Sequence, residues 1–256
     1  MQVQGGGSGV PDRSCPGLVT EAAQPIGGHL VRAERRGGTS RLGSPQRAGS
    51  HRLRPRRPKD MPEPTFTQDW ARHFVDNAQS HLMPLAGEPL RYLEIGVFEG
   101  RSSRWMLENV LTHEDSRLIG IDAWPIAGDP FESRARANLQ DHASKVELHK
   151  GEAGDVLRDP KFERETFDVI YIDGDHRALP VLTDSVLTWP LLKVGGLCIW
   201  DDYRWKRAPW KRAPRHERPG DAVDAFLQAI QGRHEVVFKN YQLGVRKTLG
   251  RLGPPT

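Results

Sequence analysis

From residue 91 onward, short apolar runs alternate with stretches of helical period along the chain. The apolar runs predict buried strands at residues 91–97, 118–123, 146–150, 167–173 and 197–200. The stretches between them predict helices at about residues 102–111, 131–142, 178–192 and 221–231, with a short helix after residues 151–154. Two closing strands are predicted at about residues 235–240 and 242–247. This alternation is typical of a doubly wound, mostly parallel sheet with helices on both faces.

A further helix is predicted ahead of the first strand, from about residue 65. Its apolar positions recur every four residues and form one stripe: Trp70, Phe74, Ala78 and Leu82. Pro84 and the turn at residues 87–89 end the pattern. We expect this helix to pack at the edge of the sheet.

Residues 1–61 have a different composition from the rest of the chain. They are rich in Gly, Arg, Pro and Ser, and carry eleven Arg and Lys against four Asp and Glu, a net charge of +7. Such a segment buries too little apolar surface to fold, so we expect a disordered basic tail. We favour the interpretation that Met61 is the working start; a transit peptide or a contact with nucleic acid or anionic lipid stays open.

The part expected to fold, residues 62–256, is mildly acidic. The whole chain has a net charge of +4, so these residues carry a net −3. This charge argues against a nucleic-acid-binding surface on the domain. No apolar run of 18 residues exists, so no membrane span is predicted. The two cysteines, Cys15 and Cys198, make no disulfide framework, and we expect a cytoplasmic protein.

Two glycines and several polar residues follow the first predicted strand. Gly96 and Gly100 permit a sharp turn, and Ser102 or Ser103 can cap the next helix. Glu94 precedes them, and Asp122 ends the second strand. Carboxyl ends of strands are where open α/β sheets bind ligands. The acidic-x-Gly-x-x-x-Gly spacing resembles motif I of the class I S-adenosylmethionine (SAM)-dependent methyltransferases, in which a carboxylate after the second strand binds the ribose.

Acidic residues also end the fourth and fifth predicted strands. Asp173 ends the fourth, followed by Asp175 and His176, and Asp201 and Asp202 end the fifth. In a parallel sheet these ends face one crevice, where clustered carboxylates favour a divalent cation such as Mg²⁺. Aspartates at strand ends often only cap the next helix, and a histidine there is often a structural hydrogen-bonding group.

The Asp-Gly-Asp-His sequence from Asp173 and the Asp-Asp-Tyr sequence from Asp201 are similar to those of metal-assisted small-molecule and sugar O-methyltransferases. This resemblance covers residues 65–247 and implies a seven-stranded Rossmann-like sheet whose last strand is antiparallel. It implies Mg²⁺ ligands at Asp173, Asp201 and Asp202, and a base or substrate contact at Asp175 or His176. The positions implied for SAM are Glu94, Gly96, Gly100, Ser102, Asp122, Glu152 and Ala153.

Two further features of the sequence each allow two interpretations. Residues 203–219 contain Trp-Lys-Arg-Ala-Pro twice in succession, which fits either a mobile lid that binds an anionic or aromatic substrate or a solvated insertion. Trp124 either covers the purine of SAM or packs in the core. Gly96→Arg is expected to abolish SAM binding and leave the protein folded.

The sequence thus predicts a SAM-dependent methyltransferase that acts on oxygen of a small molecule or sugar. An NAD(P)-dependent oxidoreductase is a second hypothesis, disfavoured by the glycine spacing and by the absence of a Tyr-x-x-x-Lys pair. A non-catalytic interaction protein is a third. The acceptor and the choice between monomer and homodimer are left open.

Overall fold

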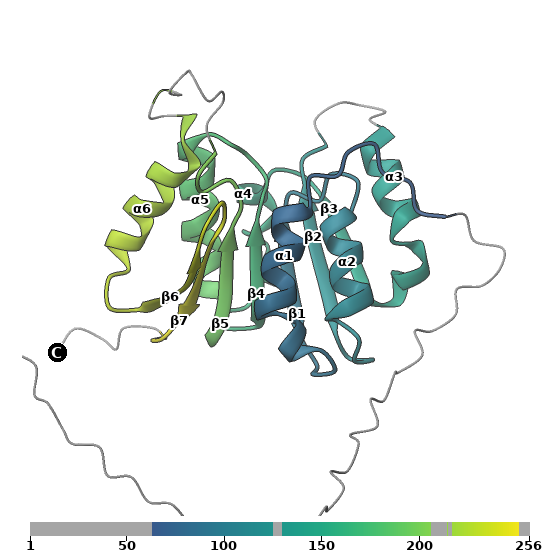
Figure 1. Cartoon of the computed structure of the whole chain (residues 1–256), viewed down its shortest axis with the longest axis horizontal. Coiled ribbons are helices and arrows are strands. Elements are labelled where there is room, and N and C mark those ends of the chain that lie inside the picture. Colours follow the sequence, from purple (N-terminus) through teal and green to yellow (C-terminus); the bar gives the residue numbers. More distant parts are fainter. Residues whose placement is uncertain (1–62, 125–129, 206–213, 215–216, 251–256) are drawn as a thin grey trace, which may run out of the picture. The chain divides into compact units, whose positions relative to one another are not determined.

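The computed structural model describes residues 63–124, 130–205, 214 and 217–250. The expectation of a disordered tail over residues 1–61 falls outside these residues, as does most of the Trp-Lys-Arg-Ala-Pro repeat. Within the described part, seven strands form one sheet in the order β3-β2-β1-β4-β5-β7-β6 (Figure 1). Neighbours from β3 to β5 pair in parallel, and β7 pairs antiparallel with both β5 and β6. The doubly wound sheet with an antiparallel last strand is therefore confirmed.

The elements alternate in the predicted order. The strands are β1 (Arg91–Ile95), β2 (Arg117–Asp122), β3 (Val146–Lys150), β4 (Phe167–Ile172), β5 (Leu192–Trp200), β6 (His234–Lys239) and β7 (Leu243–Lys247). The α-helices are α1 (Arg72–His81), α2 (Arg101–Asn109), α3 (Pro130–Asn138), α4 (Ala153–Val156), α5 (Ala178–Thr188) and α6 (Pro219–Ala229). Short 3₁₀ turns occupy Met83–Leu85, Gln140–Lys145 and Trp189–Leu191. No helix among the described residues combines the length and the apolar character needed to cross a bilayer.

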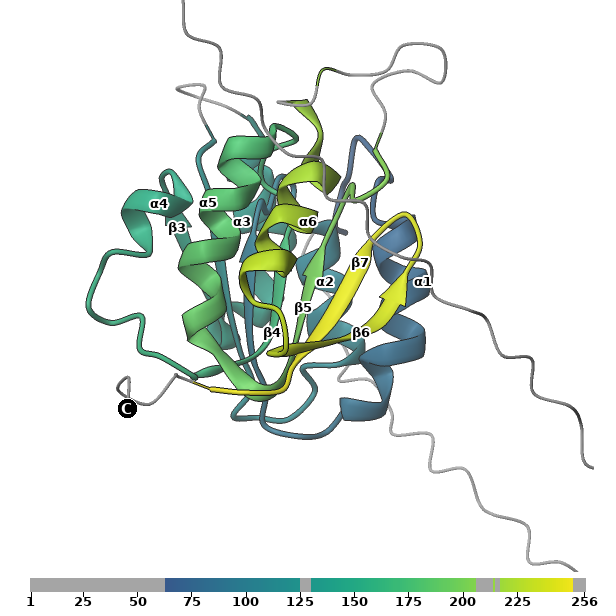
Figure 2. The same ribbon diagram turned by 90° about the vertical axis from the view of Figure 1, so that its left-hand side faces the viewer.

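Two apolar layers cover the two faces of the sheet. On one face, α4, α5 and α6 pack through residues such as Val181, Val223 and Phe226. On the other, α1 and α2 pack through residues such as Phe74 and Met106. Figure 2 looks onto the edge formed by β6 and β7, with α6 on one side of the sheet and α1 on the other.

The placement of α1 differs from the expectation. The helix begins at Arg72, and its Phe74 ring lies 4.6 Å from that of Tyr171 in β4, so α1 covers central strands rather than the sheet edge. Trp70 precedes the helix, is 69% exposed and stacks on Phe98. The predicted stripe of apolar residues at every fourth position therefore included Trp70, which does not belong to the helix.

The boundary between α5 and β5 also lies elsewhere than predicted. The helix was expected to reach residue 192, but it ends at Thr188, and a 3₁₀ turn containing Pro190 follows. Proline lacks the amide hydrogen that a continuing helix needs. The strand then begins at Leu192 and includes a register shift opposite Phe167 and Val169, which lets it contain Gly195 at a φ of +86°.

Candidate functional site

The predicted site residues follow strands whose carboxyl ends lie side by side. Ile95 of β1 is in register with Ile121 of β2 and Ile172 of β4, and Ile172 is in register with Trp200 of β5. The residues just after these positions therefore meet at one edge of the sheet. This convergence, on which the sequence argument depended, is present in the fold.

Gly96 is needed at the turn after β1 because another strand passes against it. Its φ is +88°, and a Cβ at this position would lie 2.1 Å from the carbonyl oxygen of Asp173. Gly96 thus allows β1 and β4 to approach each other. A side chain here would disturb the fold, which does not support the expectation that Gly96→Arg stays folded. Gly100, at a φ of +78°, is the N-cap residue of α2.

Glu94 is a buried carboxylate that joins β1 to α2. The hydroxyls of Ser102 and Ser103 each donate a hydrogen bond to one of its oxygens. The two serines therefore bind Glu94 and do not cap α2, whose N-cap Gly100 makes no side-chain cap. Burial raises the pKa of Glu94 to about 7, although the hydrogen bonds act in the opposite direction.

The carboxylate of Asp122 is fixed by three backbone amides. Oδ2 accepts hydrogen bonds from the N–H groups of Val97 and Phe98, each at 2.8 Å, and Oδ1 accepts one from Trp124 at 2.8 Å. A carboxylate has about four acceptor positions, so it retains capacity for a ligand. The turn after β1 and the end of β2 are thus one hydrogen-bonded unit.

Trp124 is a packing residue in this structure. Its side chain is 2% exposed and lies in a small cluster with Val97 and Ala135. The indole N–H donates to the carbonyl oxygen of Phe98 at 3.0 Å. Of the two interpretations that the sequence left open, the packing one agrees with these contacts.

Glu152 and Ala153 lie at the start of α4, in the turn after β3. Glu152 is the N-cap residue and is exposed, whereas Ala153 is 8% exposed. The turn adjoins the end of β2, because the amide of Gly151 donates to the carbonyl oxygen of Asp122 at 2.9 Å. Both residues are therefore near the Asp122 end of the edge.

Asp173, His176 and Asp202 form a compact cluster at the other end. One potential ligand atom from each lies within 4.8 Å of the other two. Nδ1 of His176 is 2.8 Å from Oδ2 of Asp202, and the imidazole stacks on Trp205 with a centroid distance of 5.5 Å. The hydrogen bond to Asp202, opposed by burial, raises the pKa of His176.

Asp201 adjoins Asp173 and has a hydrogen-bond partner that Asp202 lacks. Its Oδ1 accepts a hydrogen bond from the amide of the fully buried Gln242, whose Oε1 accepts one from Asn77 of α1 at 2.7 Å. Alternation along β5 explains this, since Ile199 faces the α1 layer and Asp201 is two residues later. The sequence grouped Asp173, Asp201 and Asp202; the structure places His176 beside Asp173 and Asp202, with Asp201 also next to Asp173.

Asp175 is paired with the side chain of Arg177, outside the cluster. Its carboxylate bonds the backbone amide of Arg177 at 2.7 Å and the guanidinium at 3.0 Å. Burial acts to raise the pKa of Asp175, but these bonds lower it below its ordinary value. Of the two candidate bases, only His176 faces the other acidic residues.

Tyr241 and Gln242, between β6 and β7, are site residues that the sequence analysis did not find. The Tyr241 hydroxyl donates to Asp202, and its ring stacks on His73 of α1 at 4.3 Å. No local pattern marks these residues, because each of the two contacts to the acidic pair spans about 40 positions in sequence. To find these residues, the sequence analysis would have had to predict that β6 and β7 form a hairpin whose turn reaches the end of β5.

The cluster has the donor set of a divalent-cation site. Burial and the neighbouring carboxylates Asp201 and Asp202 raise the pKa of Asp173, and burial and Asp202 likewise raise the pKa of Asp201. These shifts show that negative charge is poorly compensated here. Carboxylate oxygens with one imidazole suit Mg²⁺ or Mn²⁺. The residues present therefore fit such an ion, which Asp173, His176 and Asp202 could hold.

Comparison with known proteins gives a family match for the core of the chain. Residues 93–203 match a family model described as a methyltransferase domain. An uncharacterised protein, R132, of Acanthamoeba polyphaga mimivirus is 32% identical over 131 residues. That match covers 46% of this chain and 55% of the viral protein, so the chain spans about half the length of this relative.

Solved structures share the fold. An O-methyltransferase from Bacillus cereus in complex with SAH (S-adenosylhomocysteine) is 20% identical, with 71% of this chain and 84% of that chain covered and a TM-score of 0.54. A putative rRNA-methylase from Clostridium thermocellum is 13% identical, with coverages of 69% and 97% and a TM-score of 0.53. The MycE methyltransferase of mycinamycin biosynthesis, in complex with Mg, SAH and mycinamycin VI, is 19% identical, with coverages of 74% and 53% and a TM-score of 0.51. Residues 93–203 thus match a methyltransferase domain, and the seven-stranded sheet that contains them has the fold of these solved methyltransferases.

Proposed function

We propose that this protein transfers the methyl group of SAM to an oxygen atom of a small molecule or sugar, assisted by a divalent cation such as Mg²⁺. One observation carries the proposal: the glycine turn with Asp122 and the cluster of Asp173, His176 and Asp202 follow adjacent strands at one sheet edge. A cofactor held at the first feature and an acceptor held at the second are then neighbours.

The cofactor half of the proposal uses the turn between β1 and α2. Gly96 and Gly100 shape this turn, and Glu94 holds it to α2 through Ser102 and Ser103. In this assignment Asp122 takes the ribose hydroxyls, because its carboxylate is already oriented by three amides and retains acceptor positions. Glu152 and Ala153, beside the end of β2, border the adenine.

The acceptor half uses the acidic cluster. A bound Mg²⁺ would orient the acceptor hydroxyl and lower its pKa. His176, held by Asp202, is positioned either as a ligand of the cation or as the base that takes the hydroxyl proton. Asp175 is the weaker candidate for the base because its carboxylate is paired with Arg177. Alignment of the acceptor oxygen with the activated methyl group can lower the barrier by about 7–11 kcal/mol.

Several other features belong to the same proposal. We assign residues 62–256 to the catalytic domain and residues 1–61 to a tail without a part in catalysis. The net −3 charge of the domain supports a small acceptor over RNA. Cys198 is buried and makes no disulfide, which supports a reducing, cytoplasmic setting.

Isothermal titration with SAH and with NADH tests the cofactor assignment. We expect SAH to bind and NADH not to bind. The converse result would favour the oxidoreductase hypothesis. A chain that binds SAH but methylates no compound in a panel of sugars and hydroxylated small molecules, with or without Mg²⁺, would favour a non-catalytic role.

Variants then locate the acceptor site. Asp202→Asn should abolish methyl transfer that depends on Mg²⁺ and leave SAH affinity unchanged. Asp115→Asn, at an exposed carboxylate before β2, is the matched control and should preserve both. Activity that survives both EDTA and Asp202→Asn would disprove the metal-assisted part of the proposal.

A further inference from the structure

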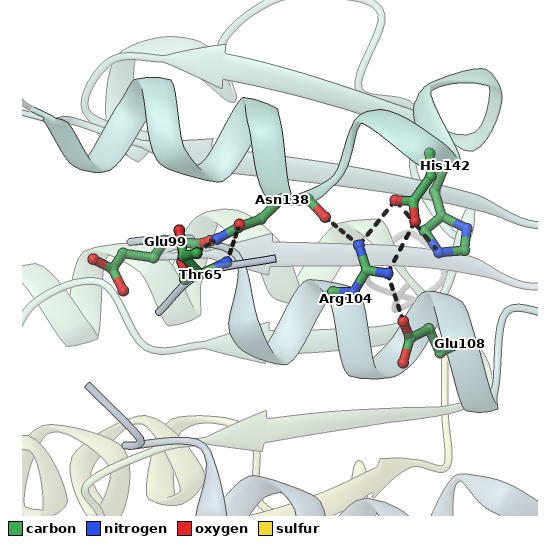
Figure 3. Close-up of polar contacts among 7 residues, drawn as sticks. Thr65, Glu99, Arg104, Glu108, Asn138 and His142 are labelled. Carbon is green, nitrogen blue, oxygen red and sulfur yellow. Dashed lines mark hydrogen bonds and ion pairs between the residues drawn. The ribbon is translucent and has the colours of Figure 1, made fainter. Parts of the chain in front are cut away.

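Residues 65–70, which we name the strap, lie against the glycine turn and α3. Asn138 of α3 joins the strap to the turn: its side-chain amide pairs with both the N–H and the C=O of Thr65, each at 2.9 Å, and also donates to the carbonyl oxygen of Glu99 at 2.9 Å (Figure 3). Asn138 is 3% exposed, so water does not compete for these bonds.

A second connection runs through the Glu99 side chain. Its carboxylate accepts hydrogen bonds from the backbone N–H of Thr67 at 2.6 Å and from the Thr67 hydroxyl at 2.7 Å, and it pairs with Arg134 of α3. Glu99 is 1% exposed. Its carboxylate is thus paired with Arg134 of α3 and hydrogen-bonded by the strap, which makes the strap a part of the turn's structure.

The outer ends of the strap make weaker contacts with the same turn. Asp69 pairs with Arg101 at 2.6 Å, and the Arg101 guanidinium lies over the Phe66 ring at 5.0 Å. Trp70 stacks on Phe98 with a centroid distance of 5.3 Å. The strap therefore contacts positions 98, 99 and 101 in succession.

A buried polar network supports Asn138 from the side of α2. Its carbonyl oxygen accepts a hydrogen bond from Arg104 of α2, and Arg104 also makes two hydrogen bonds of 2.9 Å with Asp141 and an ion pair with Glu108 (Figure 3). Arg104 is 7% exposed. This network ties α2 to the end of α3, where Asn138 contacts the strap.

The contacts at the turn lead to the Asp122 carboxylate. The amide of Phe98 is one of its three donors, and Phe98 adopts a φ of +51°, a conformation that a residue with a side chain rarely holds without surrounding contacts. The ring of Phe98 is held between Trp70 and Phe131, at 5.3 and 4.5 Å. The strap thus stabilises the backbone that orients Asp122.

We infer that the strap is a working part of the cofactor site and that Glu99 and Asn138 are positioning residues for SAM, acting through the turn and Asp122. This inference rests on the proposed function, which assigns SAM to the turn. It predicts that SAH affinity depends on residues that precede the methyltransferase-family match at 93–203 and that need not touch the cofactor.

The test uses full-length Asn138→Leu, which removes the side-chain amide, and Thr67→Pro, which removes both the N–H and the hydroxyl that bind Glu99. We expect each to raise the SAH dissociation constant about tenfold in calorimetry, because the strap acts on the cofactor indirectly, through the turn. Hydrogen exchange should show faster exchange at the amides of Val97 and Phe98, with unchanged protection in β4. Glu99→Gln, which keeps an acceptor for Thr67, should bind SAH better than Glu99→Ala.

The matched control is Lys247→Met. Lys247 is 4% exposed and donates to the carbonyl oxygen of Leu192, at the opposite end of β5 from the acidic pair. It should lower the melting temperature and leave SAH affinity unchanged. If the strap variants bind SAH as the wild type does, or if affinity falls equally in Lys247→Met, the inference is overturned and the proposed function stands. A wild-type chain without affinity for SAH overturns both.

Discussion

Nδ1 of His176 lies 2.8 Å from Oδ2 of Asp202, which joins the segment after β4 to the end of β5. Asp202 has a φ of +52° and also accepts a hydrogen bond from Tyr241. A residue held in this conformation by two partners has a defined side-chain direction. The pair therefore determines which acidic residue of the Asp201–Asp202 sequence faces His176.

This pairing predicts a pH dependence. Because Asp202 raises the pKa of His176 above 6.5, the histidine contributes stability that is fully present below pH 6.5 and is lost as the pH rises through the raised value. In metal-free buffer, the midpoint of the His176 imidazole in an NMR titration should fall in Asp202→Asn, with other histidine midpoints unchanged. Equal midpoints in the two proteins would show that the pairing is absent in solution.

Glu94 should make the protein less stable as pH rises. Its pKa is raised from 4.5 to about 7, so the folded state binds the proton more tightly than the unfolded state, and stability present below pH 4.5 is lost between these values. Between pH 4.5 and pH 8, the free energy of unfolding of Glu94→Gln should rise relative to that of the wild type by at most about 3 kcal/mol. Urea unfolding of both proteins across this range measures the difference. A constant difference would contradict the assignment.

Substitutions at Gly96 and Gly195 distinguish the cost of backbone strain from the cost of a steric clash. Both have a positive φ, of +88° and +86°, but a Cβ meets the carbonyl oxygen of Asp173 only at Gly96, and nothing within 4 Å at Gly195. Gly195→Ala should cost about 1 kcal/mol of unfolding free energy from φ alone. Gly96→Ala should cost at least about 3 kcal/mol because the strands must move apart. Similar costs in denaturant unfolding would mean that β1 and β4 are not so close.

Binding of Mn²⁺, followed by electron paramagnetic resonance, tests the cation site without an acceptor. Asp202→Asn should remove binding. Tyr241→Phe removes only the hydrogen bond donated to Asp202 and should weaken binding about tenfold, as loss of an outer partner of a ligand typically does. Asp115→Asn should bind as the wild type does. If Asp202→Asn still binds Mn²⁺, other residues hold the ion.

The strands could be located along the chain because buried parallel strands are continuous apolar runs that glycines terminate, whereas the antiparallel last strand was implied only by the family resemblance. The shared edge of Glu94, Asp122 and Asp173 follows from that topology alone. The side-chain partners could not be predicted. Ser102 and Ser103 resemble helix caps in sequence, and only the depth of Glu94 below α2 shows that they bind the carboxylate instead.

The different partners of Asp201 and Asp202 could not be predicted for a similar reason. Two adjacent aspartates look equivalent in sequence, but strand alternation and the backbone of Asp202 send them to different partners. Trp70 matched a helical period by coincidence, since α1 begins only at Arg72. Local patterns specify elements, whereas contacts between distant segments specify the site.

The contacts between the β6–β7 hairpin and the end of β5 have a consequence for the order in which the protein folds during synthesis. Tyr241 and Gln242 secure two aspartates that are made about 40 residues earlier. During synthesis on the ribosome, the parallel core from β1 to β5 can therefore assemble while Asp201 and Asp202 still lack these partners. The proposed acceptor half of the site would then be completed only when the final hairpin has left the exit tunnel and folded back across the sheet.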